Sequence, residues 1–225
     1  GDIITGCLVQ GVVRPTQNVV FLPTHGPSRA CEGKVFSIEM HHENIDEAKA
    51  GDNVGICIRG IDKTYPPKTG DVMVIKGDPI TPSTRFTARI QVLQHPNELK
   101  VGYSPIAYVR TAHASVRMAA IVWKIPKKSK TMEAEPSPHS LKTGDFAEVV
   151  FEPSKPLVVE KFGVCEALGR VAIMEGNRAI MLGKVVAVGD EEAPAWVAPS
   201  AKGKKKKKKK KGGKKKGGKK KKKSG

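Results

Sequence analysis

The sequence lacks the patterns that mark membrane-spanning and many catalytic proteins. No run approaches the roughly 18 apolar residues of a membrane helix, so no membrane partner is expected. The opening residues, GDIITGCLVQG, contain no basic segment followed by an apolar one, and no signal peptide is visible. A G-x-S-x-G nucleophile elbow is also absent. A Ser–His–Asp or Cys–His arrangement whose members meet only in the fold stays open.

Paired cysteines are missing as well. Cys7, Cys31, Cys57 and Cys165 are far apart in the chain and form no C-x-x-C pair. This spacing disfavours a disulfide framework and a zinc site. It predicts reduced, buried cysteines that behave as small apolar residues, and hence a cytoplasmic protein.

Acidic residues are absent from positions 202–225, which contain 17 lysines. These lysines account for all but +1 of the formal charge of +18, so residues 1–201 are nearly neutral. A lysine run buries no apolar surface and repels itself, which predicts a disordered tail over 191–225.

Long stretches of helical periodicity are also absent; the most helix-like stretch, 44–49, is too short to be stable alone. Short alternating or β-branched runs recur instead, closed by Gly, Pro or Asn-Asp, and predict an all-β fold of barrels or sandwiches. The segment KGDPITPST, 76–84, predicts the boundary between two barrels, 1–82 and 85–190. The expected strands are 3–9, 18–22, 33–40, 54–59, 71–75, 85–93, 106–114, 116–123, 147–151, 157–160, 169–174 and 179–188.

The stretch SIEMHHENIDEAKAGDNVG places His41 and His42 among carboxylates, the residue types of metal sites and acid–base chemistry. Successive side chains of a strand point to opposite faces, so adjacent histidines after a strand diverge. A metal site on a strand favours H-x-H, and one on a helix favours H-x-x-x-H. The pattern therefore favours surface histidines on a solvated acidic turn over a metal centre.

A nucleotide site is not supported either. GPSRACEGKV, 26–35, ends in Gly-Lys like a phosphate-binding loop, but its two glycines are too far apart. Val35 also occupies the position at which a Ser or Thr would hold magnesium. Neither G-x-x-x-x-G-K-[ST] nor N-K-x-D occurs anywhere in the chain.

The order of several segments is distinctive. DIITGCLVQGVVRP, GKVFSIEMHHENIDEAKAGDNVG and GDVMV resemble the second domain of the elongation factor 1-alpha and elongation factor Tu family. GYSPIAYVRTAHASVRM, SLKTGDFAEVVFEPSKPLVVE and LGRVAIMEGNRAIMLGKVVAV resemble its third domain. VFLPTH, DVMVIKGD and AEVVFEPSKPLVVE are most similar to the eukaryotic elongation factor-like branch.

The resemblance implies two packed β-barrels that bind aminoacyl-tRNA when an upstream domain holds GTP. The chain would then begin inside a larger reading frame, with the first strand of its first barrel missing. The fragment itself would be non-enzymatic and need no cofactor, while the complete protein would be a GTPase using GTP and Mg²⁺. The implied partners are aminoacyl-tRNA, the ribosome, a nucleotide-exchange factor and the chain's own N-terminal GTPase domain.

The resemblance also assigns site residues. Glu39 matches the Glu beside the terminal adenosine of tRNA, and Asn53 lies in the turn lining the amino-acid pocket. His42 stands where the bacterial factor has Arg, which weakens any charge-based contact there. In the second barrel, the residues matching those that face the T-stem of tRNA are Arg110, Thr111, His113, Ser115, Gly176 and Arg178.

Two other functions stay open. A release-factor-type relative would use the same barrels to bind a protein shaped like tRNA, although EMHHE and RTAHAS favour tRNA itself. A non-catalytic interaction protein would use its lysine tail to bind bulk RNA or acidic filaments.

Overall fold

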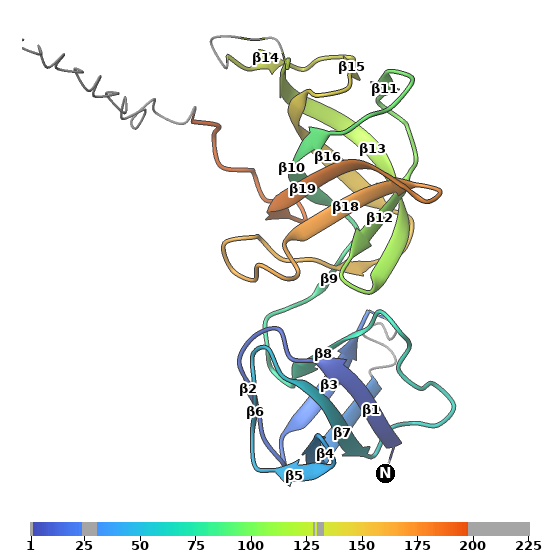
Figure 1. Cartoon of the computed structure of the whole chain (residues 1–225), viewed down its shortest axis with the longest axis vertical. Helices are drawn as coiled ribbons and strands as arrows, with labels where there is room; N and C mark the ends of the chain where they lie inside the picture. Colours follow the sequence, from blue (N-terminus) through green and yellow to red (C-terminus); the bar gives the residue numbers. More distant parts are fainter. Residues whose placement is uncertain (1, 24–30, 128, 130–132, 198–225) are drawn as a thin grey trace, which may run out of the picture.

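Residues 2–23, 31–127, 129 and 133–197 are described by a computed structural model. They form two β-barrels, one after the other along the long axis of the molecule (Figure 1). Every regular element among these residues is a β-strand. The described residues therefore include no helix long and apolar enough to cross a membrane. The predicted fold class, two packed β-barrels, is confirmed for the described part of the chain.

The first barrel is an antiparallel six-stranded sheet with a two-stranded ribbon beside it. The sheet order is β1-β7-β4-β3-β8, with β5 paired to β4, while β2 pairs with β6. The strands are β1 (Asp2–Cys7), β2 (Val12–Val13), β3 (Asn18–Leu22), β4 (Cys31–Met40), β5 (Glu43–Ile45), β6 (Ala48–Lys49), β7 (Asn53–Arg59) and β8 (Val72–Ile75).

The core of the first barrel follows from the alternation of its strands. In β7, the buried residues Val54, Ile56 and Ile58 alternate with less buried ones, as expected where one face of a strand points inward. They pack with Val19 and Phe21 of β3 and with further apolar residues of β4. Burial of this apolar surface stabilises the barrel without any disulfide.

The second barrel is closed. Its six main strands follow the order β12-β18-β19-β10-β16-β13, and β13 pairs back to β12. Three short pairings add to it: β14 with β13, β11 with β15, and β9 with β17. The strands are β9 (Pro82–Ser83), β10 (Phe86–Val92), β11 (Leu99–Lys100), β12 (Ile106–Val109), β13 (Ala112–Ile125), β14 (Glu135–Pro136), β15 (Ser140–Leu141), β16 (Phe146–Pro153), β17 (Leu157–Val158), β18 (Arg170–Glu175) and β19 (Arg178–Val188).

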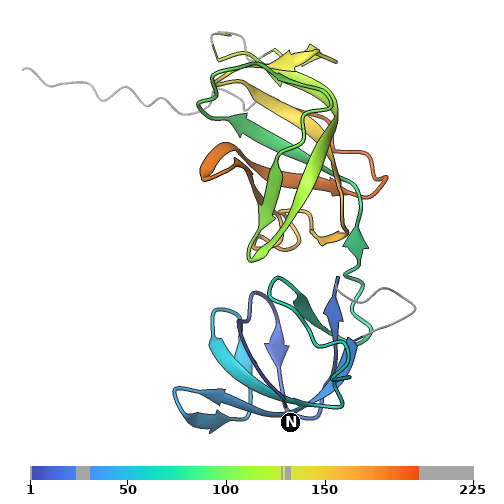
Figure 2. The same ribbon diagram turned by 90° about the vertical axis from the view of Figure 1, so that its right-hand side faces the viewer.

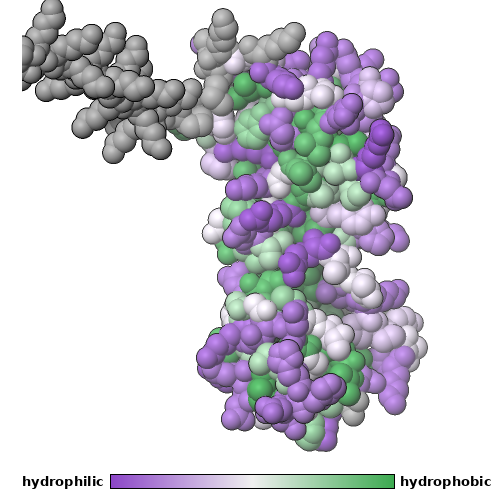
Figure 3. Space-filling view, viewed as in Figure 1, coloured by the Kyte–Doolittle hydropathy of each residue, from purple (hydrophilic) through white to green (hydrophobic). Residues whose placement is uncertain are grey.

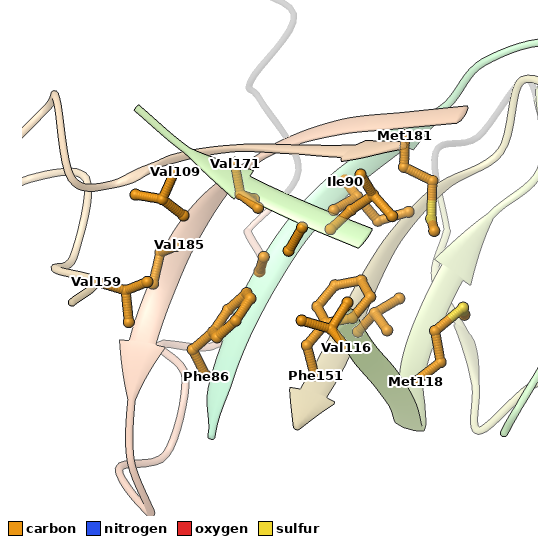
Figure 4. Close-up of a cluster of buried hydrophobic side chains, with 14 of the residues drawn as sticks. Phe86, Ile90, Val109, Val116, Met118, Phe151, Val159, Val171, Met181 and Val185 are labelled. Carbon is orange, nitrogen blue, oxygen red and sulfur yellow. The ribbon is translucent and has the colours of Figure 1, made fainter. Parts of the chain in front are cut away.

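The interior of the second barrel is filled by side chains from every main strand (Figure 4). Phe86 and Phe151 lie on neighbouring strands at its centre, with ring centroids 5.5 Å apart and no exposed surface. Ile90, Met118 and Met181 are equally buried and close the space around the rings. This packing makes the barrel a rigid support for residues on its outer face.

The two barrels lie next to each other along the long axis (Figures 1 and 2), and side chains of the first contact the second. Val9, Leu22 and Val72 of the first barrel pack against the core of the second. Gly70 approaches the β12–β13 turn so closely that a Cβ there would lie 3.2 Å from the Cα of Ala112. Its φ of +103° also favours glycine. The connecting segment is tied to the second barrel through the pairing of β9 with β17.

Two predictions about local structure are wrong, one about a strand and one about the cysteines. The expected strand 106–114 is interrupted, because Arg110 adopts a positive φ of 56° and turns the chain between β12 and β13. No Gly or Pro marks this turn, so the uninterrupted alternation concealed it. The stretch 44–49, which was expected to be too short for a stable helix, contributes to β5 and β6. Among the cysteines expected to be buried, Cys7 is exposed and Cys57 only half-buried.

The segment after β19 folds back onto the second barrel. Trp196 packs against both Trp123 and Phe146, with ring centroids 5.1 and 5.3 Å away. The Arg89 guanidinium lies 5.4 Å from the Trp196 ring, donates to the Pro194 carbonyl and pairs with the buried Glu148. The predicted disordered tail, 191–225, thus includes residues that pack on the barrel, and its part from 198 onward lies outside the described residues.

Candidate RNA-binding surfaces

The two adjacent histidines form a hairpin turn. His41 and His42 connect β4 to β5, and Met40 and Glu43 on either side are paired. Both histidines have positive φ, 53° and 68°, as a two-residue type I′ turn requires. Non-glycine residues are uncommon in this conformation, and such backbone strain often accompanies a functional site.

Glu39 lies two residues before the turn and faces it. Its carboxylate is 3.5 Å from Nδ1 of His42, a contact that becomes an ion pair when the imidazole is protonated. The side chain of Glu39 is half exposed and that of His42 fully exposed, so the contact adds little stability. Both groups remain open to a ligand.

A hollow with a volume of about 630 Å³ opens between β1, β4 and β7, and all three predicted 3′-end residues line it. Glu39 and His42 come from β4 and its turn, and Asn53 begins β7, opposite Cys7 of β1. Gly55 is opposite Glu39 and leaves that side of the hollow without a side chain. The structure therefore brings together residues that are 14 positions apart in the sequence.

The contribution of β1 to this hollow was missed by the sequence prediction. Ile3, Thr5 and Cys7 line it from alternate positions of the strand. Ile3 is 70% exposed, which is unusual for a large apolar side chain. Outward-facing positions of an alternating strand were the available signal, but the pairing of β1 with β7 was needed to place them.

The chemistry of the hollow suits a mostly neutral ligand. Glu39 is the only carboxylate among the lining residues, which contain no Lys or Arg. A carboxylate accepts hydrogen bonds from hydroxyl and amino groups and disfavours phosphate. Among the described residues, no three His, Cys, Asp or Glu side chains gather closely enough to hold a metal ion.

The predicted T-stem residues lie on the outer face of the second barrel. Thr111, His113 and Ser115 are exposed and alternate with the buried Ala112 and Ala114. The His113 ring stacks on Tyr108 of the neighbouring strand at 5.3 Å between centroids. These side chains therefore form one row along β13.

Five of the six predicted T-stem residues form two groups at opposite ends of β12, and His113 lies between the groups, opposite Tyr108. Ser115 is opposite Ile106, which in turn pairs with Met174 beside the Gly176–Arg178 turn. Arg110 and Thr111 form the other end, near the first barrel. Four residues of strand separate the ends, about 13 Å. Figure 1 shows the β12–β13 turn facing the first barrel and the β18–β19 turn at the right.

A second hollow, with a volume of about 930 Å³, lies on the outside of β10, β18 and β19. Its lining includes Phe162, whose ring has Lys184 Nζ at 3.8 Å and the Arg170 guanidinium at 5.4 Å. Arg170 is paired with Glu166, and Lys161 with Glu191. Of the predicted T-stem residues, Arg110 reaches this hollow. No sequence motif indicated this second hollow.

Two family profiles match the chain in sequence. Residues 1–74 match the family described as elongation factor Tu domain 2, and residues 85–186 match the family described as GTP-eEF1A C-terminal domain-like. The chain belongs to the elongation factor 1-alpha and elongation factor Tu family. The predicted family is thus confirmed, and the chain corresponds to the C-terminal part of a translation elongation factor.

Individual relatives agree with this assignment. The chain is 40% identical over 189 residues to elongation factor 1-alpha of Ignicoccus hospitalis, covering 84% of this chain and 41% of that protein. It is 41% identical over 190 residues to elongation factor 1-alpha of Metallosphaera sedula, with coverages of 84% and 40%. The chain thus spans about two fifths of the length of these elongation factors.

Solved structures show the same architecture. The chain is similar to Sup35 complexed with GMPPNP, with a TM-score of 0.73 and 26% identity, over 83% of this chain and 44% of that one. The match to Sup35 complexed with GDP has a TM-score of 0.71 and 25% identity, with the same coverages. The elongation factor chain described here therefore shares its two-barrel arrangement with these proteins.

Proposed function

We propose that the two barrels bind aminoacyl-tRNA in the GTP state of a longer elongation factor, which delivers it to the ribosome. The observation that carries this proposal is the shared hollow lined by Glu39, His42 and Asn53. These residues were selected by family resemblance alone, and they come from separate segments of the first barrel. Membership of the elongation factor family supports the same function.

The hollow would take the aminoacylated 3′ end. Single-stranded RNA ends present unstacked bases and hydroxyls that proteins bind by hydrogen bonds and stacking. The Glu39 carboxylate would accept a hydrogen bond from the terminal adenosine, and Asn53 would contact the amino-acid side. A site that accepts many amino acids has to bind their common parts, because side-chain complementarity would discriminate among them.

The outer face of the second barrel would bind the T-stem. Double-stranded RNA is recognised mainly through phosphates and 2′-hydroxyls, for which Arg, Ser and Thr provide suitable donors. Arg110 and Thr111 would contact the stem at one end of β12, and Ser115 with Gly176 and Arg178 at the other. The roughly 13 Å between the two groups allows contacts with separate phosphates of one stem.

Nucleotide chemistry would belong to another part of the complete protein. We propose that GTP and Mg²⁺ bind an N-terminal GTPase domain, served by a nucleotide-exchange factor, and that this chain needs neither. No phosphate-binding motif occurs in its sequence. Calorimetric titration of this chain with GTP and Mg²⁺ should give no binding heat. Stoichiometric binding of GTP to this chain would contradict the proposal that the nucleotide binds only in the N-terminal domain.

Glu39→Ala should weaken the binding of aminoacyl-tRNA by about tenfold or more in the complete, GTP-bound protein. A hydrogen bond to a charged group contributes roughly 1.5–3 kcal/mol, and 1.4 kcal/mol corresponds to a factor of ten. The change is measured by filter binding of labelled aminoacyl-tRNA.

The matched control for this variant is Glu43→Ala, which removes an exposed carboxylate from the same hairpin but outside the hollow. Its affinity for aminoacyl-tRNA should stay within about twofold of the parent, because Glu43 lies outside the hollow and would not contact the 3′ end, although the lost charge is the same. Equal affinities for both variants, with unchanged thermal stability, would show that the 3′ end is placed wrongly.

A further inference from the structure

His95 is a buried histidine at the end of the second barrel, in the loop that follows β10. Its side chain is only 7% exposed, and its Nε2 lies 3.2 Å from the Glu175 carboxylate. A carboxylate only accepts hydrogen bonds, so Nε2 carries the proton. Nδ1 then accepts from the Asn97 N–H at 3.2 Å, and the carbonyl oxygen of the same residue lies 2.8 Å away. The ring is thus held on both sides.

The backbone of His95 is fixed as firmly as its ring. The His95 N–H donates to Oγ1 of Thr143 at 3.1 Å, and the same hydroxyl donates to the His95 carbonyl at 3.0 Å. Tyr103 approaches the ring edge-on, with centroids 6.1 Å apart. Burial, together with the neighbouring Glu175 carboxylate, raises the pKa of Tyr103 to about 12. Three loops at this end of the barrel therefore meet around one imidazole.

Glu175 connects this cluster to the proposed RNA surface. It is the last residue of β18, and in the antiparallel pairing of β18 with β19 it lies opposite Arg178, the first residue of β19. The Gly176–Asn177 turn connects the two strands. The Glu175 side chain is 56% exposed and is held by the hydrogen bond from His95, with the Tyr103 hydroxyl also beside it. The hydrogen bond from His95 therefore fixes the side chain of the residue directly before the turn.

We propose that His95 is a positioning residue for the RNA stem: it holds the Glu175 carboxylate against the barrel and so leaves Arg178 free for phosphate. This inference depends on the proposed T-stem function of Gly176 and Arg178. Without the bond, the carboxylate competes with phosphate for Arg178, because opposite charges on paired strand positions attract. The released Glu175 carboxylate would also lie near the RNA phosphates, and the like charges would repel each other.

The test compares His95→Leu, which fills a similar space without a donor, with His95→Gln, which keeps an N–H donor. Each is made in the whole chain, and binding is measured at a salt concentration that suppresses the lysine tail. The probe is a stem-loop RNA of about a dozen base pairs without a single-stranded 3′ end, and binding is followed by fluorescence anisotropy. His95→Leu should bind about three- to tenfold more weakly, while His95→Gln should stay close to the parent.

A double variant distinguishes positioning from general damage. His95→Leu combined with Glu175→Gln removes the released charge, so its affinity should return to within about twofold of the parent. A purely structural loss would persist in the double variant and overturn the inference. If His95→Leu does not fold, Glu175→Gln alone decides: unchanged or tighter binding supports the inference, and a tenfold loss overturns it.

Arg178→Ala separates this inference from the function on which it depends. If Arg178→Ala leaves stem binding unchanged, the proposed T-stem surface itself is wrong. If Arg178→Ala weakens binding but His95→Leu does not, the surface stands and the positioning role of His95 is wrong.

Discussion

Deletion of residues 202–225 should lower the affinity of the chain for arbitrary RNA by about a hundredfold or more at low salt. The deleted segment carries 17 lysines, and the rest of the chain has a formal charge of only +1. Each phosphate that a lysine neutralises releases a counterion, so the logarithm of affinity falls with the logarithm of salt by roughly 0.7–0.9 per contact. The large positive charge of the protein therefore acts almost entirely through this segment.

The surface of the barrels explains why little of this affinity should remain. Figure 3, viewed from the same side as Figure 1, shows mostly hydrophilic residues on the surface of both barrels, with hydrophobic patches between them. Many of the charged residues are paired with opposite charges, as in Arg14–Glu47, Lys76–Glu32 and Arg117–Glu152. Such a surface produces no strong field of one sign.

The measurement is a salt titration of binding to an unstructured RNA, with a same-length tail in which Gln replaces every lysine as the control. Both the deletion and the Gln variant should lose the steep salt dependence. Any preference for aminoacylated tRNA should survive in both, since the tail contributes no selectivity. Loss of that preference would show that the tail takes part in specific recognition.

Phe151→Ala should lower the free energy of unfolding of the second barrel by about 3–5 kcal/mol. Phe151 is fully buried against Phe86, so the substitution loses both apolar burial and the ring contact. For a barrel of about 100 residues, each kcal/mol corresponds to roughly 4–8 °C in Tm. Thermal unfolding followed by circular dichroism should therefore shift by about 12 °C or more.

The matched control for this variant is Phe36→Ala. Phe36 is 50% exposed and its main contact is the Arg59 guanidinium, 3.3 Å from the ring centroid. Loss of the Phe36 ring should lower the free energy of unfolding by about 1 kcal/mol or less. Similar costs for both substitutions would contradict the view that the barrel is held together by its interior.

Most strands could be predicted from alternation, because half-buried strands bury every second residue. The prediction 18–22 coincides with β3, and 54–59 and 179–188 each differ from the observed strand by one residue at the start. The β12–β13 turn could not be predicted in this way. Its positive-φ residue is Arg110, and the conformation is imposed by strand pairing instead of by local residue type.

The site could be predicted only in part. Glu39, His42 and Asn53 were predicted from resemblance and share one hollow, although their roles stay predictions. The contribution of β1 and the contact between His95 and Glu175, 80 residues apart, depend on which strands become neighbours. Sequence patterns report the faces of a strand, but they do not report its partners.

We propose that these barrels bind the aminoacylated form of tRNA. The most direct test is a filter-binding comparison of aminoacylated and deacylated tRNA, using the complete GTP-bound protein at a salt concentration that suppresses the lysine tail. We expect a preference for aminoacyl-tRNA of about tenfold or more, which Glu39→Ala should reduce and deletion of 202–225 should leave unchanged. Equal affinity for both tRNAs would contradict it, and loss of all binding with the tail would indicate a basic interaction protein instead.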